Sequence, residues 1–314
     1  EGGRGGAVQF YLFAAFLVVA FLALNSSLSI LNCWALGAHG GLSFPLIVTG
    51  VHMITGTAAI APLMALHPGY YACLKREWAR RWRALSAIGV MNVTQIALNN
   101  SSLVSLELSM NQIVRATGPV LTALIAIYVE NRVPTPRAFA CLLTVALGVM
   151  VTVFKGMART SALGLAMVAL STVTQCTQIS LSGRLMAGSG GRLDAFQMTF
   201  YTGPVACLTI APFALAVEAR AFSYALASAP TTVLAFLLGS SALAVLYNVA
   251  LFQALKTLST TGTAVLGNVK IVLLLLLSAI ALGELRTWSA QQLVGVVVTF
   301  GASAVYSMLK VKST

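Results

Sequence analysis

The sequence predicts an all-α membrane protein whose ten transmembrane helices form two inverted five-helix repeats. Three observations support this fold class: the composition, a succession of long apolar segments, and a charge pattern that recurs in both halves. Of the 314 residues, 58% are hydrophobic and 8% are charged, whereas a soluble domain carries about 25% charged residues. The composition therefore excludes a cytosolic enzyme, a disordered chain and a disulfide scaffold, and it indicates a protein whose solvent is lipid.

Ten apolar segments are long enough to cross a bilayer as helices, which takes roughly 20 mostly apolar residues each. Turn-forming or charged residues separate them, for example His67-Pro68-Gly69 and Pro134-Thr135-Pro136. The predicted spans are residues 8–36, 43–66, 84–104, 108–130, 136–154, 161–187, 193–217, 231–255, 260–283 and 288–309.

The distribution of basic residues predicts the orientation of these spans. The net charge is +12, but the bases lie in short breaks between apolar segments and no nucleic-acid-binding motif is present, so nucleic acid is not an expected partner. Thirteen Lys and Arg residues fall on one side of the predicted membrane and four on the other. The positive-inside rule then places both termini on the cytosolic side.

The break between the second and third spans carries a dense basic segment. Residues Lys75–Arg83 alternate bases with Trp78 and Trp82, which lie four residues apart and hence on one face of a helix. This pattern is typical of a short helix that lies among the cytosolic lipid headgroups. A regulatory or partner-binding patch is the alternative interpretation.

A charge pattern recurs about half the chain length apart and indicates an internal duplication. Arg115 and Glu130 in the first half correspond to Lys270 and Glu284 in the second, at offsets of 155 and 154 residues. Because each copy has an odd number of spans, the second copy would have inverted topology. The predicted repeats are residues 1–157 and 158–314, which together form one membrane domain.

Arg115 and Lys270 are two positive charges inside predicted spans. A charge at the centre of a spanning helix costs roughly 2.5–3.5 kcal/mol, and all seven acidic residues fall in predicted loops or at helix ends. We therefore expect the two bases, one from each repeat, to converge on an anionic solute near the membrane midplane. The alternatives are that Arg115 snorkels or pairs with Glu107, and that Lys270 binds backbone carbonyls. The lack of intramembrane carboxylates favours anion exchange over proton-driven pumping.

Uncharged polar residues cluster near these bases, at the ends of spans three, four, eight and nine. Such residues either contact ligands or bond helices to one another, and their clustering favours ligand contacts, whereas Gln175 and Gln178 fit the helix-bonding role. We expect Gly118-Pro119 and Gly267 to act as hinges that loosen the helix beside each base. The predicted polar pocket comprises Asn99, Asn111, Gln112, Thr117, Tyr247, Gln253, Thr263 and Asn268.

Chemistry-bearing motifs are not evident elsewhere in the sequence. No nucleophile–base combination is visible, and His39, His52 and His67 lack metal-ligand spacing. We therefore expect no catalytic residues, no metal site and no cofactor, and a protein that is not an enzyme.

Two segments resemble the motifs of a known family. Ser109-Met110-Asn111-Gln112, with Ala116-Thr117 and Pro119, resembles the fourth-span motif of the nucleotide-sugar and triose-phosphate translocator family. Val265-Leu266-Gly267-Asn268-Val269-Lys270 resembles the ninth-span motif of the same family, which belongs to the drug/metabolite transporter superfamily. The resemblance covers the whole chain. It implies ten helices in inverted repeats, a central pocket, and antiport by alternating access.

The residues that differ from the family motifs indicate a branch. Triose-phosphate members carry a His where this chain has Gln112, and Lys-Arg where it has Lys270-Ile271. The motifs are closer to those of nucleotide-sugar carriers, which implies exchange of a nucleotide sugar for a nucleoside monophosphate, with Lys270 and Arg115 at the phosphates. The alternative is a plastid inner-envelope exchanger of sugar phosphates and inorganic phosphate.

The resemblance to nucleotide-sugar carriers also implies a multi-pass protein of the Golgi or endoplasmic reticulum. Lys310 and Lys312 resemble a dilysine retrieval signal of the early secretory pathway, which would face the cytosol in the predicted topology. The expected partners are a small anionic substrate and membrane lipid, and the sequence allows a homodimer.

Overall fold

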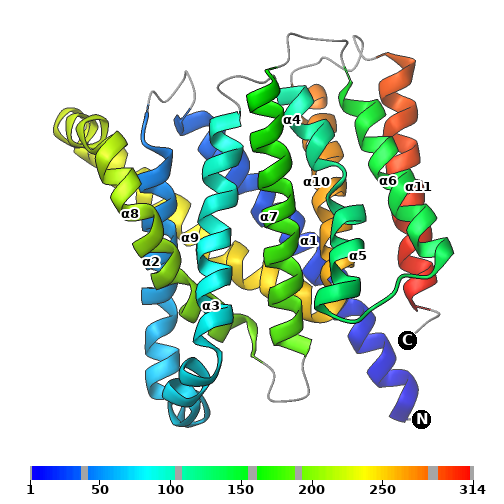
Figure 1. Ribbon diagram of the computed structural model, residues 1–314, viewed down its shortest axis with the longest axis horizontal. Coiled ribbons are helices and arrows are strands. Elements are labelled where there is room, and N and C mark those ends of the chain that lie inside the picture. Colours follow the sequence, from blue (N-terminus) through cyan, green and yellow to red (C-terminus); the bar gives the residue numbers. More distant parts are fainter. Residues whose placement is uncertain are drawn as a thin grey trace. The chain divides into compact units, whose positions relative to one another are not determined.

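The computed structural model describes residues 2–36, 42–102, 108–154, 161–187, 193–281 and 289–311. Over these ranges the chain forms α-helices and no strand, which confirms the all-α prediction (Figure 1). The helices are α1 (Gly2–Leu36), α2 (Pro45–Leu66), α3 (Pro68–Ser102), α4 (Leu108–Arg115), α5 (Gly118–Val129), α6 (Pro136–Val153), α7 (Ala162–Ala187), α8 (Ala195–Ser228), α9 (Pro230–Leu258), α10 (Thr260–Ala281) and α11 (Ala290–Val311).

The described helices fit a multi-pass membrane protein. Eight helical segments in the described ranges are long and apolar enough to cross a membrane, and they lie on α1, α2, α4–α5, α6, α7, α8, α9 and α11. The other two predicted spans coincide with α3 and α10. The membrane-spanning role of these two helices, and with it the count of ten, stays a prediction.

Four elements differ from the predicted spans. Helix α1 begins at Gly2, before the predicted start at residue 8. Helix α3 begins at Pro68, because the basic segment and the third span form one continuous helix that no Gly or Pro interrupts between residues 70 and 88. Helix α8 continues to Ser228, since most of its last residues favour helices. The fourth span is divided into α4 and α5.

The chain forms two compact units that are not the two halves of the sequence. The first unit comprises Glu1–Val93 and Leu185–Thr257, and the second comprises Thr94–Arg184 and Leu258–Thr314. Each unit therefore combines helices from both predicted repeats. The division into repeats at residue 157 stays a prediction about duplication, distinct from this division by contacts.

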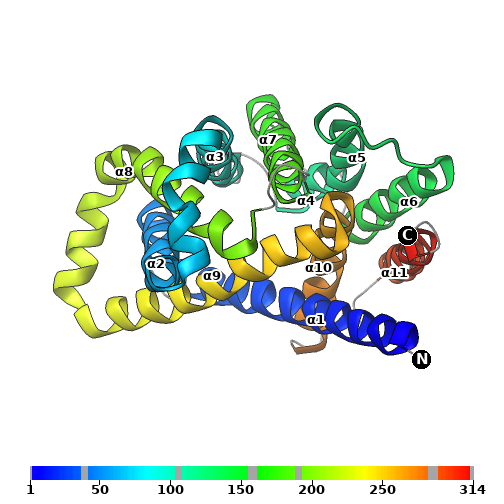
Figure 2. The ribbon, with the colours of Figure 1, turned by 90° about the horizontal axis from the view of Figure 1, so that it is seen from below.

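In the first unit, α2 and α8 pack along their length in opposite directions (Figures 1 and 2). A Cβ at Gly203 of α8 would meet the Thr57 hydroxyl and would lie 2.8 Å from the Met53 carbonyl oxygen, so only glycine permits this approach. Near the other end of the pair, Ile210 lies against Gly50. The close fit aligns α8 with α2 over several turns.

The start of α2 is capped by a side chain from α8. Glu218 is buried, and its two carboxylate oxygens accept the backbone N–H groups of Leu46 at 3.0 Å and Ile47 at 2.8 Å. The first N–H groups of a helix lack intrahelical acceptors, and the helix N-terminus carries a partial positive charge. The Glu218 carboxylate satisfies these donors and complements that charge.

In the second unit, α6 and α11 cross through two matching Gly–Thr pairs. A Cβ at Gly148 would lie 2.9 Å from the backbone nitrogen of Thr299, and a Cβ at Gly295 would lie 2.6 Å from that of Thr152. The pairing shows that the helices run antiparallel, side by side in Figures 1 and 2. Small residues on facing surfaces allow two helix backbones to approach in this way.

Helices α5 and α10 also run antiparallel in the second unit. The Thr260 hydroxyl, at the start of α10, donates to Glu130 Oε1 at 2.8 Å, just after the end of α5. At the other end of the pair, Ala116 packs with Val272. Gly183 of α7 lies directly against the Thr260 methyl group. These contacts fix the position of α10 and of the side chains along it.

Candidate functional site

The fourth predicted span breaks beside Arg115. Helix α4 ends at Arg115, and α5 begins at Gly118. Pro119, in the first turn of α5, has no N–H and cannot donate to the Arg115 carbonyl. In the intervening turn, Thr117 donates its N–H (3.2 Å) and its hydroxyl (2.7 Å) to the Val114 carbonyl. The helix is therefore interrupted at the position where Gly118-Pro119 predicts a weak point.

Amide side chains from two other helices orient the Arg115 guanidinium. Nη1 donates to Asn99 Oδ1 at 2.8 Å, near the end of α3, and Nη2 donates to Gln175 Oε1 at 3.0 Å, in α7. Both acceptors are neutral, so these bonds direct the guanidinium without cancelling its charge. Arg115 is half-buried, and a charge in such surroundings acts more strongly on a ligand than it does in water.

Asn111 belongs to the same hydrogen-bond network. Its side chain is 1% exposed, and Nδ2 donates to Asn99 Oδ1 at 3.1 Å and to Ser102 Oγ at 2.8 Å. One oxygen of Asn99 thus accepts from both Asn111 and Arg115. The structure therefore brings two predicted pocket residues together around one of the two predicted phosphate-binding bases.

Lys270 approaches Arg115 from α10. It is half-buried, and Asn268, two residues before it, donates to the carbonyl of Ala116, the residue that follows Arg115. Both residues belong to the second compact unit. Two cations held near one another in a medium of low dielectric constant create a strong positive potential, which attracts an anion.

Asn268 fastens α10 to the break in the fourth span. It is 3% exposed, and its Nδ2 donates to the Ala116 carbonyl oxygen at 2.8 Å. From α7, the Cys176 thiol donates to the Gly118 carbonyl at 3.4 Å. The Ala116 carbonyl follows the end of α4, where helix carbonyls lack intrahelical donors, and Asn268 supplies one. Asn268 thereby holds the segment that carries Arg115 against the helix that carries Lys270.

Two further predicted pocket residues of the second unit have different surroundings. Thr263 is buried, and its hydroxyl donates to the Ser259 carbonyl at 2.8 Å, at the start of its own helix. Gln112 is half-buried in α4. The remaining two, Tyr247 and Gln253, are half-buried on α9, in the first unit. The roles of all four as substrate contacts stay predictions.

Gly118 and Gly267 lie beside open space. A Cβ built at either position would meet no described atom within 4 Å. Helix α10 nevertheless continues unbroken through Gly267, so the expected loosening is present beside Arg115 and not beside Lys270. A lone glycine keeps its backbone N–H, whereas Pro119 removes one. Packing does not require either glycine, and the hinge roles stay predictions.

Gln175 bonds α7 to α4 through Arg115, which agrees with its predicted helix-bonding role, but the sequence prediction did not foresee Arg115 as its partner. One turn away on α7, the Ser171 hydroxyl donates to the Gln95 carbonyl at 2.7 Å, so this face of α7 meets α3. A polar stripe of Ser171, Gln175 and Gln178 was visible in the sequence, but its neighbour was not. Glu107, Glu284, Lys310 and Lys312 lie outside the residues whose side chains the structure describes.

Comparison with known proteins reveals a family match over most of the chain. The sequence pattern of the Triose-phosphate Transporter family matches residues 12–307. A probable sugar phosphate/phosphate translocator of Arabidopsis thaliana is 24% identical over 264 residues, which cover 82% of this chain and 72% of the relative. UDP-uronic acid transporter 1 of the same organism is 24% identical over 261 residues, covering 82% and 84%. A crystal structure with 17% identity matches 94% of this chain and 98% of its own with a TM-score of 0.68, which shows the shared fold.

Proposed function

The chain belongs to the triose-phosphate transporter family, and on that basis we propose that it exchanges a nucleotide sugar for a nucleoside monophosphate. The observation that carries this proposal is the bond from Asn268 to the Ala116 carbonyl, which joins the helix of Lys270 to the segment of Arg115 within one unit. A phosphate group between the two cations would offset their mutual repulsion. A substrate with a diphosphate carries two negative charges and matches the charge of the pair.

The geometry around Arg115 suits a phosphate ligand. The guanidinium presents several N–H donors in one plane, which allows two parallel bonds to phosphate oxygens, whereas the Lys270 ammonium acts as a point charge. Asn99 and Gln175 already fix the direction of the guanidinium, so less side-chain entropy is lost on binding.

We propose that the transporter works by alternating access between two inverted repeats. Three antiparallel helix pairs support duplication, because α2 and α8, α5 and α10, and α6 and α11 would be the second, fourth and fifth spans of each repeat. The Gly–Thr pairs also correspond, since Gly148 and Gly295, like Thr152 and Thr299, are 147 residues apart. Equivalent helices of inverted repeats have opposite directions.

Obligatory exchange follows from the charges of the proposed site. An empty site with the positive charges of Arg115 and Lys270 would cross the barrier between conformations more slowly than a site that also holds an anion, because moving charge within a membrane is costly. A bound anion on each leg of the cycle removes that cost. We therefore propose that the protein is an antiporter. The motifs that resemble nucleotide-sugar carriers favour a Golgi or endoplasmic reticulum membrane, and the distribution of bases favours cytosolic termini.

Uptake into preloaded vesicles tests the exchange reaction. The purified chain is reconstituted into liposomes that contain a nucleoside monophosphate, inorganic phosphate or buffer alone, and entry of labelled nucleotide sugars is followed. We expect rapid uptake only into the vesicles that contain nucleoside monophosphate. Equal uptake into buffer-filled vesicles would contradict antiport.

The same assay separates a second candidate, exchange of sugar phosphates for inorganic phosphate. A relative named as a probable sugar phosphate/phosphate translocator favours this candidate, and the relative named as a UDP-uronic acid transporter favours the first. Uptake of a labelled sugar phosphate into phosphate-loaded vesicles alone would replace the first proposal by the second. The two cations would then bind a single phosphate group.

A further inference from the structure

The first part of α3 is an amphipathic segment that differs in direction from the rest of its helix. Figure 1 shows the start of α3 seen along its axis, whereas the later part runs upright, next to α2. The segment comprises residues 68–83, and all of it belongs to the first unit. It contains five of the 19 basic residues of the chain and one acid.

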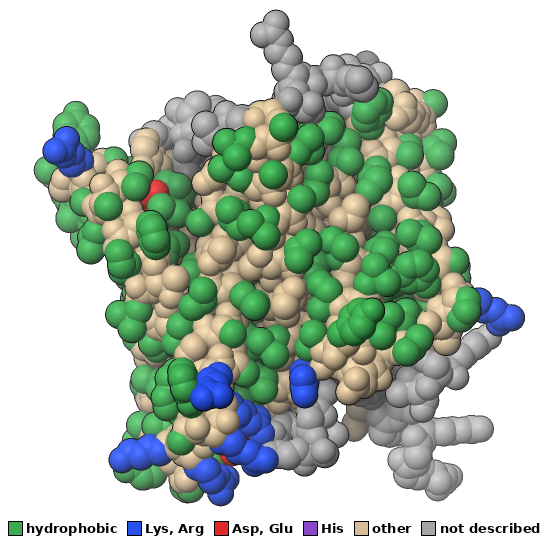
Figure 3. Space-filling view, in the orientation of Figure 1, with side chains coloured by type: hydrophobic (Ala, Val, Ile, Leu, Met, Phe, Trp, Pro, Cys, Tyr) green, Lys and Arg blue, Asp and Glu red, His purple; other side chains and the backbone are tan. Residues whose placement is uncertain are grey.

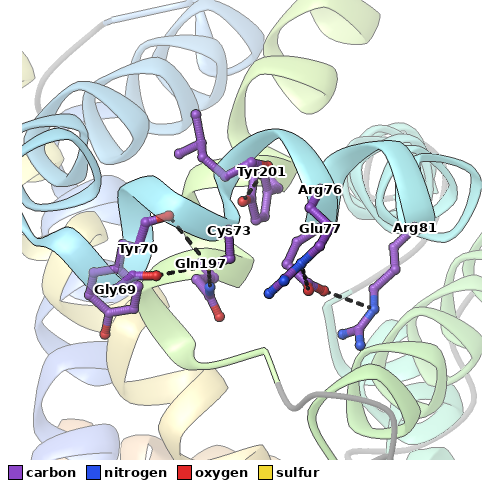
Figure 4. Close-up of polar contacts among 9 residues, drawn as sticks. Gly69, Tyr70, Cys73, Arg76, Glu77, Arg81, Gln197 and Tyr201 are labelled. Atoms are coloured by element: carbon purple, nitrogen blue, oxygen red, sulfur yellow. Dashed lines mark hydrogen bonds and ion pairs between the residues drawn. The ribbon is translucent and has the colours of Figure 1, made fainter.

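Contacts with α8 hold this segment in place (Figure 4). The Tyr70 hydroxyl donates to Asp194 Oδ2 at 2.5 Å, and the Tyr201 hydroxyl donates to the Leu74 carbonyl at 3.0 Å. The rings of Trp78 and Tyr201 lie 6.0 Å apart. The segment is therefore a docked element whose exposed face has a fixed position.

The acid of the segment is turned inward and is already engaged. Glu77 is buried, and it lies 3.3 Å from Arg81, whose side chain is only 11% exposed. Arg76 lies 3.6 Å from Glu77, but its side chain is 74% exposed and reaches the surface (Figure 4). The inward face therefore contains a neutralised pair, and the outward face contains only bases among its charged residues.

The outward residues form two neighbouring stripes. Arg76, Arg80 and Arg83 follow helical spacing along one stripe, and Tyr71, Lys75, Trp78 and Trp82 follow it along the next. All of these side chains are exposed, and the Arg83 guanidinium lies 5.5 Å from the centre of the Trp82 ring. Figure 3 shows Lys and Arg side chains gathered at this lower end of the first unit.

We propose that residues 68–83 form a binding surface for anionic phospholipid headgroups at the membrane surface. Trp and Tyr favour the headgroup region of a bilayer. A helix that combines an aromatic stripe with a basic one binds by burying apolar area and by attraction to anionic lipid. The bend lays these stripes crosswise to α2, as a helix in the plane of the interface requires. The docking on α8 removes the entropy cost of ordering the segment at the membrane.

The two stripes favour binding of lipid over binding of a soluble anion. A soluble phosphate would use only the bases, whereas the exposed aromatic side chains beside them need an apolar neighbour. The surface contains neither Arg115 nor Lys270, so lipid binding can be tested independently of the transport reaction.

Fluorescence quenching by brominated lipids tests the proposal. The full chain is reconstituted in phosphatidylcholine bilayers in which a fixed fraction of the lipid is brominated phosphatidylserine or brominated phosphatidylcholine. Because each base near a membrane surface strengthens anionic-lipid binding about fivefold, we expect phosphatidylserine to quench Trp78 and Trp82 at several-fold lower fractions. High salt is expected to weaken this preference.

A combined variant supplies the decisive comparison: Lys75→Gln, Arg76→Gln, Arg80→Gln and Arg83→Gln. It is expected to lose the preference for phosphatidylserine. The matched control replaces four exposed bases elsewhere, Arg132, Arg137, Arg184 and Lys256, by Gln, and it is expected to retain the preference. A combined variant that keeps the preference, or a control that loses as much of it, overturns the proposal.

Two further experiments use the unaltered chain, so their results do not depend on whether the variants fold. A preference for phosphatidylserine that is unchanged at 1 M salt, roughly a 3 Å screening length, overturns the electrostatic part of the proposal. Soluble glycerophosphoserine and inorganic phosphate are expected not to restore the fluorescence. Efficient competition by either would assign the surface to a soluble anion and would overturn its assignment to lipid.

Discussion

Arg115 and Lys270 are two half-buried cations on segments that the Asn268–Ala116 hydrogen bond joins, where the surroundings screen charge less than water does. The neutral amides of Asn99 and Gln175 orient Arg115 and leave its charge in place. A phosphate group at this point would change repulsion into attraction. The energetic effect of either base therefore depends on whether an anion is bound.

Lys270→Ala separates a transport role from a structural one. We expect exchange in preloaded liposomes to fall at least tenfold, because one of the two charges proposed to bind the phosphate is lost. Thermal stability without substrate is expected to stay constant or rise, since a half-buried cation and its repulsion are removed. The control is Lys256→Ala, an exposed base on α9, which should leave both properties unchanged. Full exchange by Lys270→Ala would contradict the proposed role of this charge in binding phosphate.

Asn268→Leu tests the connection between α10 and the break in the fourth span. The Ala116 carbonyl would lose its donor at a buried position, which typically costs about 1–3 kcal/mol. We expect a lower unfolding midpoint, measured in detergent without substrate. Asn268→Asp has almost the same shape but lacks the N–H donor, so it should also be destabilised. Wild-type stability in both variants would show that this hydrogen bond is unimportant.

Tyr70 gives the chain a specific response to alkaline pH. Its hydrogen bond to Asp194, assisted by burial, raises the pKa of the phenol from 10.0 to about 12. The folded chain therefore holds this proton more tightly than the unfolded chain does, so the stabilisation is present below pH 10 and is lost as the pH rises through about 12. Tyr70→Phe is expected to flatten the fall in unfolding midpoint over this window. An identical alkaline profile in the variant would contradict the assignment.

At the scale of elements, glycine decides how closely helices approach. Gly148 and Gly295 allow the backbones of α6 and α11 to come into contact, and Gly203 does the same for α8 and α2. These pairs leave no room for a Cβ, in contrast to Gly118, Gly267 and Gly301. Each close crossing therefore fixes the relative position of two helices that are far apart in the sequence.

Gly295→Ala and Gly301→Ala form a matched pair on α11. A Cβ at Gly295 would lie 2.6 Å from the Thr152 nitrogen and 2.7 Å from the Gly148 oxygen, and such overpacking costs about 1–3 kcal/mol. A Cβ at Gly301 meets no described atom within 4 Å, so Ala there should be neutral or stabilising by up to about 1 kcal/mol. Unfolding midpoints of the two variants provide the measurement. Equal midpoints would show that the helices separate easily at this crossing.

At the scale of the whole molecule, substrate binding should appear as stabilisation of the folded chain. A ligand that binds only the native state at a hundred times its Kd adds about 2.7 kcal/mol. A thermal-shift screen of nucleotide sugars, nucleoside monophosphates and sugar phosphates is expected to give the largest shifts for the first two classes. The shifts should disappear in Lys270→Ala. Shifts with sugar phosphates alone would support the plastid-type exchange.

Much of the helical architecture could be predicted from the sequence, because a bilayer imposes local requirements. A spanning segment must be apolar, about 20 residues long and internally hydrogen-bonded, and all three properties are readable along the chain. Pro119 marked the break beside Arg115 for a similarly local reason. The lengths of α3 and α8 were underestimated, since helix-forming residues carried both helices past their apolar segments.

The sequence by itself determined where most helices lie, the two bases inside predicted spans and the family motifs. Only the tertiary structure decided that Asn99 and Gln175 hold Arg115, that Asn268 binds the Ala116 carbonyl, and that Glu218 caps α2. Apolarity and helix propensity depend on neighbours along the chain, whereas these contacts join residues on different helices. Which helix faces meet depends on how closely side chains and glycines allow the backbones to pack, and no single segment of the sequence contains that information.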